Sequence, residues 1–389
     1  MTAKGDISVT IMTREYPPDV YGGAGVHVDY LSHALARLMP VEVRRFGSHH
    51  AASESGPAVV GYDPWPELAR GSDARLRKVL DPLSVNLAMV RDPIGTEVVH
   101  CHTWYTFFAG HLAKMMYGVK LITTIHSLEP LRPWKREQLG RGYEVSSWME
   151  RAGVESSDAV IAVSQAMRDD IISHYNVDPA RVVVIHNGID LAAYRRVEDR
   201  KALDARGIRQ PYVLFVGRVS RQKGITYLLE AAESFPEGVT LVLCASSPDT
   251  PELQEEVVQK VSRMRNVVWI DRMLPKSELV QLYSHASVFV CPSVYEPFGI
   301  INLEAMACET AVVATAVGGI PEVVEDGITG ILVEPGNPVD LARAVTGILE
   351  SPDVARRMGE AGRARVEERF SWQAIAKQTK RLYEEIAAS

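Results

Sequence analysis

The chain has 389 residues, of which 46% are hydrophobic and 23% are charged, so it can bury substantial cores and is not a disordered polymer. Because single cores stop growing at about 250–300 residues, we expect two domains. The 49 Asp and Glu residues outnumber the 42 Lys and Arg residues, and the net charge of -7 argues against a general nucleic-acid surface.

No segment is long and apolar enough to predict a membrane span. The uncharged stretch 279–295 contains Gln281, Ser284 and His285 and is shorter than the ~20 apolar residues that a spanning helix needs. The apolar run 7–12 is shorter than a secretory core of roughly 7–15 residues. We therefore expect a cytoplasmic protein without stable membrane insertion. The four cysteines show no C-x-x-C spacing and are interpreted as buried thiols.

Short apolar runs alternate with segments of helical period, which is typical of parallel sheets covered by helices. The first series of predicted strands lies at 8–13, 41–46, 98–104, 120–127, 159–164 and 182–188. The second series lies at 212–218, 240–246, 267–271, 287–293, 310–315 and 331–335. A charged stretch without a strand pattern separates them, so we place the boundary near residues 190–205. The sequence predicts an α/β protein with two doubly wound sheets and a final amphipathic helix that can dock elsewhere.

The loop that follows the first predicted strand carries glycines just before a helical segment. Gly23 and Gly25 would let backbone N–H groups approach an anion at the helix N-terminus. Val28 stands where the dinucleotide-binding fingerprint needs a third small residue, so this fingerprint is absent. On this evidence alone, phosphate contact and an ordinary glycine-rich turn stay equally open.

Two cations follow the first strand of the second series. Arg218 and Lys223 leave the carboxyl end of that strand, where open α/β sheets bind their ligands. They could neutralise a departing diphosphate without a metal ion, Arg218 through bidentate hydrogen bonds and Lys223 as a point charge. An exposed basic loop without a ligand is the alternative at this stage.

The segment 293–307 carries the clearest signal. Glu296 and Glu304 lie eight residues apart in apolar surroundings, and the segment enters a helix near Gly299. The free N–H groups of Gly299, Ile300 and Ile301 would point at an anion. If one helix carried both carboxylates they would be ~12 Å apart, beyond the ~5–9.5 Å that glycosidase pairs use. The two carboxylates therefore suit separate tasks.

No metal or cofactor is expected. The sequence has no H-E-x-x-H and no D-x-D that would hold a divalent ion on a diphosphate. Ten of the eleven histidines precede Gly188, which excludes a histidine-based centre built wholly from the second half.

These motifs resemble those of a known family. The sequence resembles the retaining GT-B glycosyltransferases of the family-4 type in two motifs. One is E-P-F-G, with Glu304 eight residues after Glu296, and the other is the G-R-x-x-x-x-K-G loop some 70 residues earlier. The segments 13–28, 126–153 and 294–315 resemble most closely the actinobacterial-type glycogen synthases, also described as α-maltose-1-phosphate synthases. The resemblance implies two Rossmann-like domains that face a central cleft: residues 1–195 on the acceptor side, joined by the returning helix 371–389, and residues 196–370 on the donor side.

The resemblance also implies roles for single residues. Arg218 and Lys223 would hold the donor diphosphate, and Gly23 would approach it from the first domain. Glu296, together with backbone groups at Gly299, Ile300 and Ile301, would hold the transferred glucose and phosphate. Glu304 would bind the ribose hydroxyls. His126 matches a histidine beside the donor sugar, although a strand-end histidine is more often structural.

The implied reaction is metal-independent transfer with retention, in which the acceptor hydroxyl attacks from the side that the nucleoside diphosphate leaves. The expected donor is ADP-glucose, and the expected acceptor is glucose 1-phosphate, with α-1,4-glucan extension as the alternative. Arg132, Lys135 and Arg136 are candidates for the acceptor phosphate, against a solvated basic turn.

Three other functional classes are alternatives to a transferase. A sugar-nucleotide 2-epimerase would share the fold, and only the full E-P-F-G context favours transfer over it. A non-catalytic glucan-binding protein is disfavoured by the intact set of charged residues. A nicotinamide dehydrogenase is disfavoured by the failed glycine fingerprint.

Overall fold

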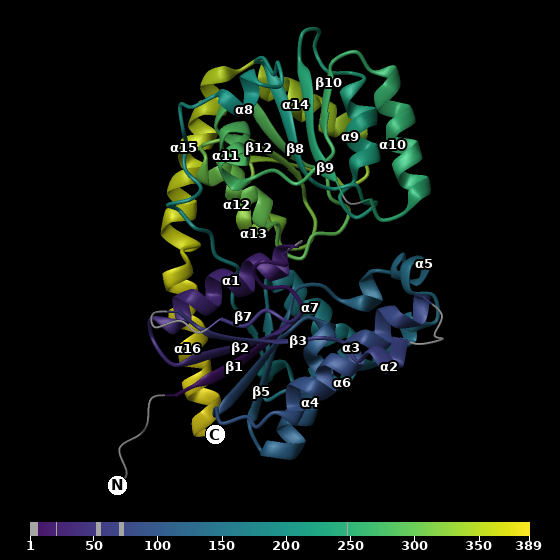
Figure 1. Ribbon diagram of the computed structural model, residues 1–389. Helices are drawn as coiled ribbons and strands as arrows, with labels where there is room; N and C mark the ends of the chain where they lie inside the picture. Colours follow the sequence, from purple (N-terminus) through teal and green to yellow (C-terminus); the bar gives the residue numbers. More distant parts are fainter. Residues whose placement is uncertain (1–6, 21, 52–55, 70–73, 247) are drawn as a thin grey trace. The chain divides into compact units, whose positions relative to one another are not determined.

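The computed structural model describes residues 7–20, 22–51, 56–69, 74–246 and 248–389 (Figure 1). Its chain divides into two compact units, Met1–Gly188 with Trp372–Ser389, and Ile189–Ser371. We call these unit 1 and unit 2. The chain therefore enters unit 2 at Ile189, and it re-enters unit 1 at Trp372. In the part of the chain that the structure describes, no helix has the length and apolar character needed to cross a membrane.

Unit 1 contains a parallel sheet of seven strands in the order β3-β2-β1-β4-β5-β6-β7. Its strands are β1 (Val9–Thr13), β2 (Val41–Phe46), β3 (Ala58–Tyr62), β4 (Val98–His102), β5 (Lys120–Ile125), β6 (Ala159–Ala162) and β7 (Val182–Val184). Its helices are α1 (Gly23–Ala36), α2 (Pro66–Ala69), α3 (Ala74–Arg91), α4 (Trp104–Tyr117), α5 (Lys135–Leu139), α6 (Gly142–Ser156), α7 (Gln165–His174) and α16 (Trp372–Ala388). Short 3₁₀ turns cover Glu129–Leu131 and Pro179–Arg181.

Unit 2 contains a parallel sheet of six strands in the order β10-β9-β8-β11-β12-β13. Its strands are β8 (Tyr212–Arg218), β9 (Thr240–Ser246), β10 (Val267–Ile270), β11 (Val288–Cys291), β12 (Val312–Thr315) and β13 (Gly330–Val333). Its helices are α8 (Lys201–Asp204), α9 (Ile225–Ala232), α10 (Pro251–Arg263), α11 (Lys276–His285), α12 (Ile300–Ala307), α13 (Ile320–Val323), α14 (Pro338–Leu349) and α15 (Pro352–Arg369).

Most strands form because their residues are apolar on both faces, as parallel strands buried between helix layers require. The strand β2 is an exception, because it contains Glu42, Arg44 and Arg45. All five residues of β1 and of β4 are buried. Several helices begin at residues that satisfy free backbone N–H groups. The side chains of Ser164 and Thr250 accept hydrogen bonds from the N–H groups of Met167 and Leu253, respectively. The sequence pattern thus matches the observed layers in each unit.

The last helix, α16, packs against α1 in unit 1, and Figure 1 shows the two helices side by side. The Trp372 ring is parallel to the ring of Tyr30, with 5.8 Å between the centroids. The hydroxyl of Tyr383 lies 2.6 Å from Nδ1 of His100 in β4. These contacts bury the apolar face of α16 in the same core as α1 and β1.

All four cysteines are buried thiols without a disulfide, as the sequence predicts. Burial raises the pKa of Cys101 and of Cys244 to about 12, so neither is a thiolate at neutral pH.

Candidate functional site

The loop after β8 holds two of the predicted cations against the end of a neighbouring strand. Arg218 is the last residue of β8, and Lys223 follows in a turn where its N–H bonds to Oγ of Ser220. Gly224 has φ of +65°, and a Cβ there would lie 1.9 Å from the carbonyl oxygen of Pro292. Only glycine fits this close approach, which places Lys223 beside the loop after β11.

Lys223 forms an ion pair with Glu296. The ammonium Nζ lies 2.5 Å from Oε2 of Glu296, and the two side chains are 16% and 9% exposed. Oγ of Ser293 donates a 3.2 Å hydrogen bond to the same oxygen. Burial alone would lower the pKa of Lys223, but the Glu296 carboxylate outweighs it and raises that pKa. Lys223 is therefore a fixed cation at neutral pH.

Arg218 is held by a different carboxylate. Its Nη1 lies 2.9 Å from Oδ1 of Asp249, which is itself positioned by a bond from its N–H to the carbonyl of Val219. The Arg218 side chain is 40% exposed. The guanidinium group is thus oriented on one side and accessible on the other.

The segment after β11 is held by two glycines. Gly318 has φ of +54°, and a Cβ on it would lie 2.0 Å from the carbonyl oxygen of Glu296. That oxygen accepts a 3.0 Å hydrogen bond from the N–H of Gly319. Helix α12 begins at Ile300 after the N-cap Gly299, whose φ is +95°. Glu296 therefore precedes the helix that carries Glu304, so the two predicted carboxylates are not on one helix.

The first turn of α12 also holds a residue that sequence reasoning missed. Asn302 is fully buried, and among the described residues neither Oδ1 nor Nδ2 has a hydrogen-bond partner. The Nδ2 atom would lie 2.6 Å from a Cβ at Gly299. A buried amide without partners is costly. The only sequence signal was a polar residue, besides Glu304, in an otherwise apolar helix.

Glu304 points into unit 2 and is hydrogen-bonded by a tyrosine. The Tyr283 hydroxyl donates a 2.9 Å bond to Oε2 of Glu304, whose residue is 8% exposed. The pKa of Glu304 is raised, because the effect of burial exceeds that of the hydrogen bonds from Tyr194 and Tyr283, which lower it. The carboxylate of Glu304 is therefore already hydrogen-bonded by both tyrosines before any ligand binds.

Unit 1 groups histidines at the carboxyl ends of β4 and β5. Nε2 of His126 lies 3.0 Å from Nδ1 of His102, and Nδ1 of His27 lies 2.6 Å from Oδ1 of Asn187. Burial lowers the pKa of His27 to about 4 and holds that of His126 well below its usual value. Neighbouring histidines act in the same direction. These rings are therefore neutral at pH 7.

His27, His102 and His126 are the described residues whose arrangement comes nearest to a metal site. Each offers a ring nitrogen, and these atoms lie within 4.8 Å of one another. Nitrogens on a tetrahedral zinc ion lie roughly 3.4 Å apart, given Zn–N bonds of about 2.0–2.1 Å. The His102–His126 hydrogen bond engages one nitrogen of each of these two rings, while Nε2 of His27 and of His102 has no partner among the described residues. Binding an ion would require the rings to move, so we assign no metal to them.

Gly23 is the first residue of α1, so Gly23 and Gly25 lie in the first turn of the helix and not just before it, as the sequence had predicted. A carboxylate of the same chain already lies near this helix N-terminus. Oxygens of Glu15 would lie 3.3 Å from a Cβ on Gly22, and one would lie 2.9 Å from a Cβ on Gly25. A negative charge is favourable at this position because of the helix dipole. Sequence analysis did not identify Glu15.

The three predicted acceptor-phosphate residues are separated by the structure. Nη1 of Arg132 donates a 2.8 Å bond to Oγ of Ser127 and lies 3.6 Å from Oε1 of Glu129. The Arg132 side chain is only 14% exposed. Arg136 is 64% exposed and pairs with Glu144 at 3.1 Å. Lys135 begins α5 and is half-buried. Arg132 is thus the inward-facing member of the group.

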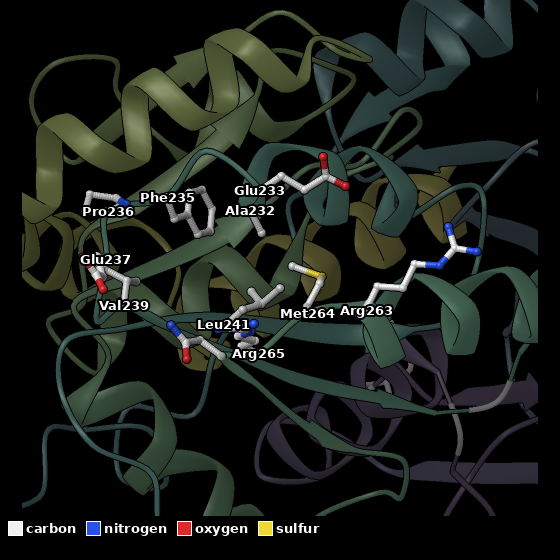
Figure 2. Close-up of a pocket in the computed structure, with 11 residues that line it drawn as sticks. Ala232, Glu233, Phe235, Pro236, Glu237, Val239, Leu241, Arg263, Met264 and Arg265 are labelled. Carbon is white, nitrogen blue, oxygen red and sulfur yellow. The ribbon is translucent and has the colours of Figure 1, made fainter.

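Figure 2 shows a pocket of unit 2 that contains none of the predicted site residues. It is lined by the end of α9, by the end of α10 and by residues at the amino ends of β9 and β10. Ligands of open parallel sheets bind at the opposite, carboxyl ends of the strands. This pocket is therefore not the donor site.

Comparisons with known proteins show the family of the chain. The family model described as Glycosyltransferase Family 4 matches residues 21–193, and the model described as Glycosyl transferases group 1 matches residues 198–365. The chain is 51% identical to the α-maltose-1-phosphate synthase of Mycolicibacterium smegmatis, over 98% of this chain and 100% of that protein. It is 30% identical to the glycogen synthase of Mycobacterium tuberculosis, over 96% and 94% of the two chains.

Among solved structures, the sucrose-phosphate synthase of Thermosynechococcus elongatus aligns with a TM-score of 0.81 and 26% identity. The alignment covers 98% of this chain and 100% of that one. The catalytic domain of starch synthase IV from Arabidopsis thaliana aligns with a TM-score of 0.76 at 17% identity, which shows a common fold. These alignments confirm the predicted GT-B class.

Proposed function

The chain belongs to the GT-B glycosyltransferases of family 4, and we propose that it transfers glucose from ADP-glucose to glucose 1-phosphate, forming α-maltose 1-phosphate. The linkage formed would be α-1,4. The relatives named α-maltose-1-phosphate synthase support this product, because they match over nearly the whole chain at 48–51% identity. The main structural support for the proposed chemistry is the ion pair of Lys223 with Glu296.

The proposed donor site uses the loops after β8 and β11. Arg218 and Lys223 would bind the diphosphate and stabilise the charge that develops as it leaves. N–H groups of Gly299, Ile300 and Ile301 at the start of α12 would contribute to the same anion site. Glu296 would hold the transferred glucose, and Glu304 would bind ribose hydroxyls in competition with its hydrogen bonds from Tyr194 and Tyr283.

The proposed roles in unit 1 involve neutral groups. His126 would lie beside the donor sugar as a hydrogen-bonding imidazole, since its lowered pKa keeps it uncharged. Gly23 would let the start of α1 approach the diphosphate, where the anion would compete with the Glu15 carboxylate. Arg132 is the candidate that the geometry favours for the acceptor phosphate, over the outward-facing Arg136.

The proposed reaction is front-face displacement with retention. The O4 oxygen of the acceptor forms a bond to C1 of glucose as the bond from C1 to the diphosphate oxygen breaks. The O4 proton passes to an oxygen of the departing diphosphate. Such a route uses no protein nucleophile, and the cations Arg218 and Lys223 supply the charge that a metal ion would otherwise bring.

Extension of α-1,4-glucan is a second candidate, because a glycogen synthase is also a full-length relative. A sugar-nucleotide 2-epimerase is the remaining alternative that shares the fold. The test combines ADP-glucose or UDP-glucose with glucose 1-phosphate, with glycogen, or with no acceptor. Nucleoside diphosphate release and product mass are measured, with and without EDTA.

We expect ADP release and a disaccharide phosphate with ADP-glucose and glucose 1-phosphate, unchanged by EDTA. Anomer-specific NMR of the product would then show the α configuration. Growth of glycogen alone would favour the second candidate, and a new sugar nucleotide without acceptor would indicate an epimerase. Absence of nucleoside diphosphate release with every combination would contradict the transferase proposal.

A further inference from the structure

Three segments of unit 1 follow strands that are neighbours in the sheet, in the order β1-β4-β5. Cζ of Arg14, in the loop after β1, lies 4.0 Å from the ring centroid of Tyr105, at the start of α4. This is a cation–π contact. Arg132 comes from the turn after β5, the strand that pairs with β4. The fold therefore places the Arg14–Tyr105 pair and Arg132 at the same edge of the sheet.

The loop that carries Arg14 is anchored on both sides. The Tyr16 hydroxyl lies 2.9 Å from Oγ of Ser32 in α1. Arg45, which is only 1% exposed, donates to the carbonyl of Pro17 at 3.1 Å and also pairs with Asp19. Because the residues that follow Arg14 are fixed in this way, the backbone from which the Arg14 side chain extends has a defined position. Preorganised groups of this kind bind a ligand at a lower entropic cost.

Arg132 is fixed from the opposite side by the turn it belongs to. Its bonds to Ser127 and its proximity to Glu129 orient Nη1. Glu129 is itself fully buried and accepts a 2.8 Å bond from Oγ of Ser146. Among the described residues, Nε of Arg132 has no hydrogen-bond partner although it is buried. A buried guanidinium N–H without a partner is a donor that a ligand can satisfy.

The start of α4 supplies another unsatisfied polar atom. Thr103, the N-cap of α4, has φ of +65°, which is unfavourable for a β-branched residue. Oγ1 of Thr103 is buried and has no partner in the part of the chain that the structure describes. The N-terminus of this 14-residue helix also favours negative charge. Strain and unpaired polar groups concentrate at sites that bind ligands.

We propose that Arg14, Tyr105 and Arg132, together with the start of α4, form a binding site for a phosphomonoester dianion. The inference rests on the proposed function and deepens it, because the ligand would be the phosphate of the acceptor. The two guanidinium groups would face a group that carries about -1.5 to -2 charges at pH 7, and this group would share Arg132 with the carboxylate of Glu129. Arg14 would distinguish a phosphorylated acceptor from the uncharged end of a glucan chain.

The test measures binding of glucose 1-phosphate to the full chain by calorimetry, and its KM in transfer from the active donor. Arg14→Gln, Arg132→Gln and the double variant are compared with Arg91→Gln, which removes a 69% exposed cation of unit 1 that has no proposed role. Loss of one charge-assisted hydrogen bond is expected to weaken glucose 1-phosphate binding by about 10- to 100-fold. Arg91→Gln should stay within about twofold of the wild type.

The pH dependence separates phosphate binding from a purely structural effect. Because the second pKa of a phosphomonoester is about 6, the wild-type KM should fall as pH rises from 5.5 to 7.5. Arg14→Gln should flatten this dependence, while Arg14→Lys, which keeps a charge, should retain it. Circular dichroism and thermal unfolding verify that each variant is folded.

The two levels of the proposal fail in different ways. If the wild type neither binds nor uses glucose 1-phosphate, the proposed function is wrong, and the inference falls with it. If the wild type uses glucose 1-phosphate but Arg14→Gln matches Arg91→Gln in KM and pH dependence, only the inference is wrong. Binding that depends on Arg132 but not on Arg14 would equally overturn it.

Discussion

The ammonium group of Lys223 and the carboxylate of Glu296 lie 2.5 Å apart, although 73 residues separate them in the sequence. They meet because β8 and β11 are neighbours in the sheet of unit 2 and both loops leave the carboxyl ends. The pair is largely buried, so its attraction is screened little by solvent. A diphosphate that approached Lys223 would have to share the ammonium group with Glu296.

The first prediction concerns this pair. Lys223→Met should lower the stability of unit 2 by about 3–5 kcal/mol, because it leaves a buried carboxylate unpaired. The double variant Lys223→Met with Glu296→Gln should regain much of that loss. Both single variants should lose transfer activity by roughly 10²–10³-fold. Thermal unfolding and kcat for the four proteins form a double-mutant cycle, and additive effects on stability would contradict the pairing.

The second prediction concerns the glycine that allows the Glu296 backbone its position. Gly318→Ala adds a Cβ 2.0 Å from the carbonyl oxygen of Glu296, at a residue with φ of +54°. The left-handed conformation alone costs alanine about 1–2 kcal/mol, and the clash adds to it. We expect a lowered melting temperature and a fall in activity, since Glu296 must shift.

Gly347→Ala is the matched control for this substitution. Gly347 lies inside α14, and a Cβ there meets nothing within 4 Å. Alanine is favoured over glycine in a helix interior by about 0.5–1 kcal/mol. This variant should therefore be slightly more stable than the wild type and fully active. Equal melting temperatures for Gly318→Ala and Gly347→Ala would refute the argument.

Most strands could be predicted from the sequence because parallel strands are continuous apolar runs. The predicted ranges 41–46, 212–218 and 240–246 coincide with β2, β8 and β9. The strand β3, at Ala58–Tyr62, was missed. It is a strand of five residues at the end of the sheet order, where it pairs with β2 and with the single residue Ala51, and half-buried positions interrupt its apolar pattern. A short edge strand does not produce a clear periodic signal.

The candidate site was predictable as far as motifs mark strand ends. Arg218, Lys223 and Glu296 were placed at the carboxyl ends of strands, and the structure brings Lys223 and Glu296 into contact. Glu15 and Asn302 could not be predicted, because their significance lies in which atoms face them across the fold. A polar residue in an apolar run does not show whether its side chain will find a partner.

The third prediction uses a buried carboxyl in unit 1. Oε1 of Glu150 accepts bonds from the N–H of Glu129 at 2.8 Å and from the Tyr175 hydroxyl. Burial and the nearby Glu129 charge raise the pKa of Glu150 to about 8. Between pH 4.5 and 8 the folded chain keeps this proton while the unfolded chain releases it. The stability that the protonated carboxyl contributes is therefore fully present below pH 4.5 and is lost as pH rises through 8.

Glu150→Gln tests this linkage because an amide resembles the protonated carboxyl and does not titrate. The difference in unfolding free energy between this variant and the wild type should grow in favour of the variant by up to about 1.4 kcal/mol per pH unit in that window. Glu144→Gln, at a position 67% exposed, is the control. Thermal unfolding at pH 5, 6, 7 and 8 gives the comparison, and parallel curves for wild type and Glu150→Gln would exclude a retained proton.

The last prediction concerns His126, whose proposed role requires a neutral ring. Burial and the neighbours His27 and His100 hold its pKa well below 6.5. Its proton NMR signal should therefore not titrate between pH 6 and 8. His33 is the internal control, because its bond to Asp29 raises its pKa and it should titrate above 6.5. If the pH profile of transfer by the wild type has an inflection near pH 6.5, His126→Asn should not abolish it.

The same shift has a consequence for stability in acid. The histidines with lowered pKa values favour the folded state fully above 6.5, and this contribution is lost as the unfolded chain takes up protons below that pH. With folded pKa values of about 4 for His27 and about 3 for His100, the loss extends down to those values. His27→Gln should make unfolding between pH 6.5 and 4 less sensitive to acid than in the wild type. A His126 signal that titrates near 6.5, or an unchanged acid dependence in His27→Gln, would show that these rings are not held neutral by burial.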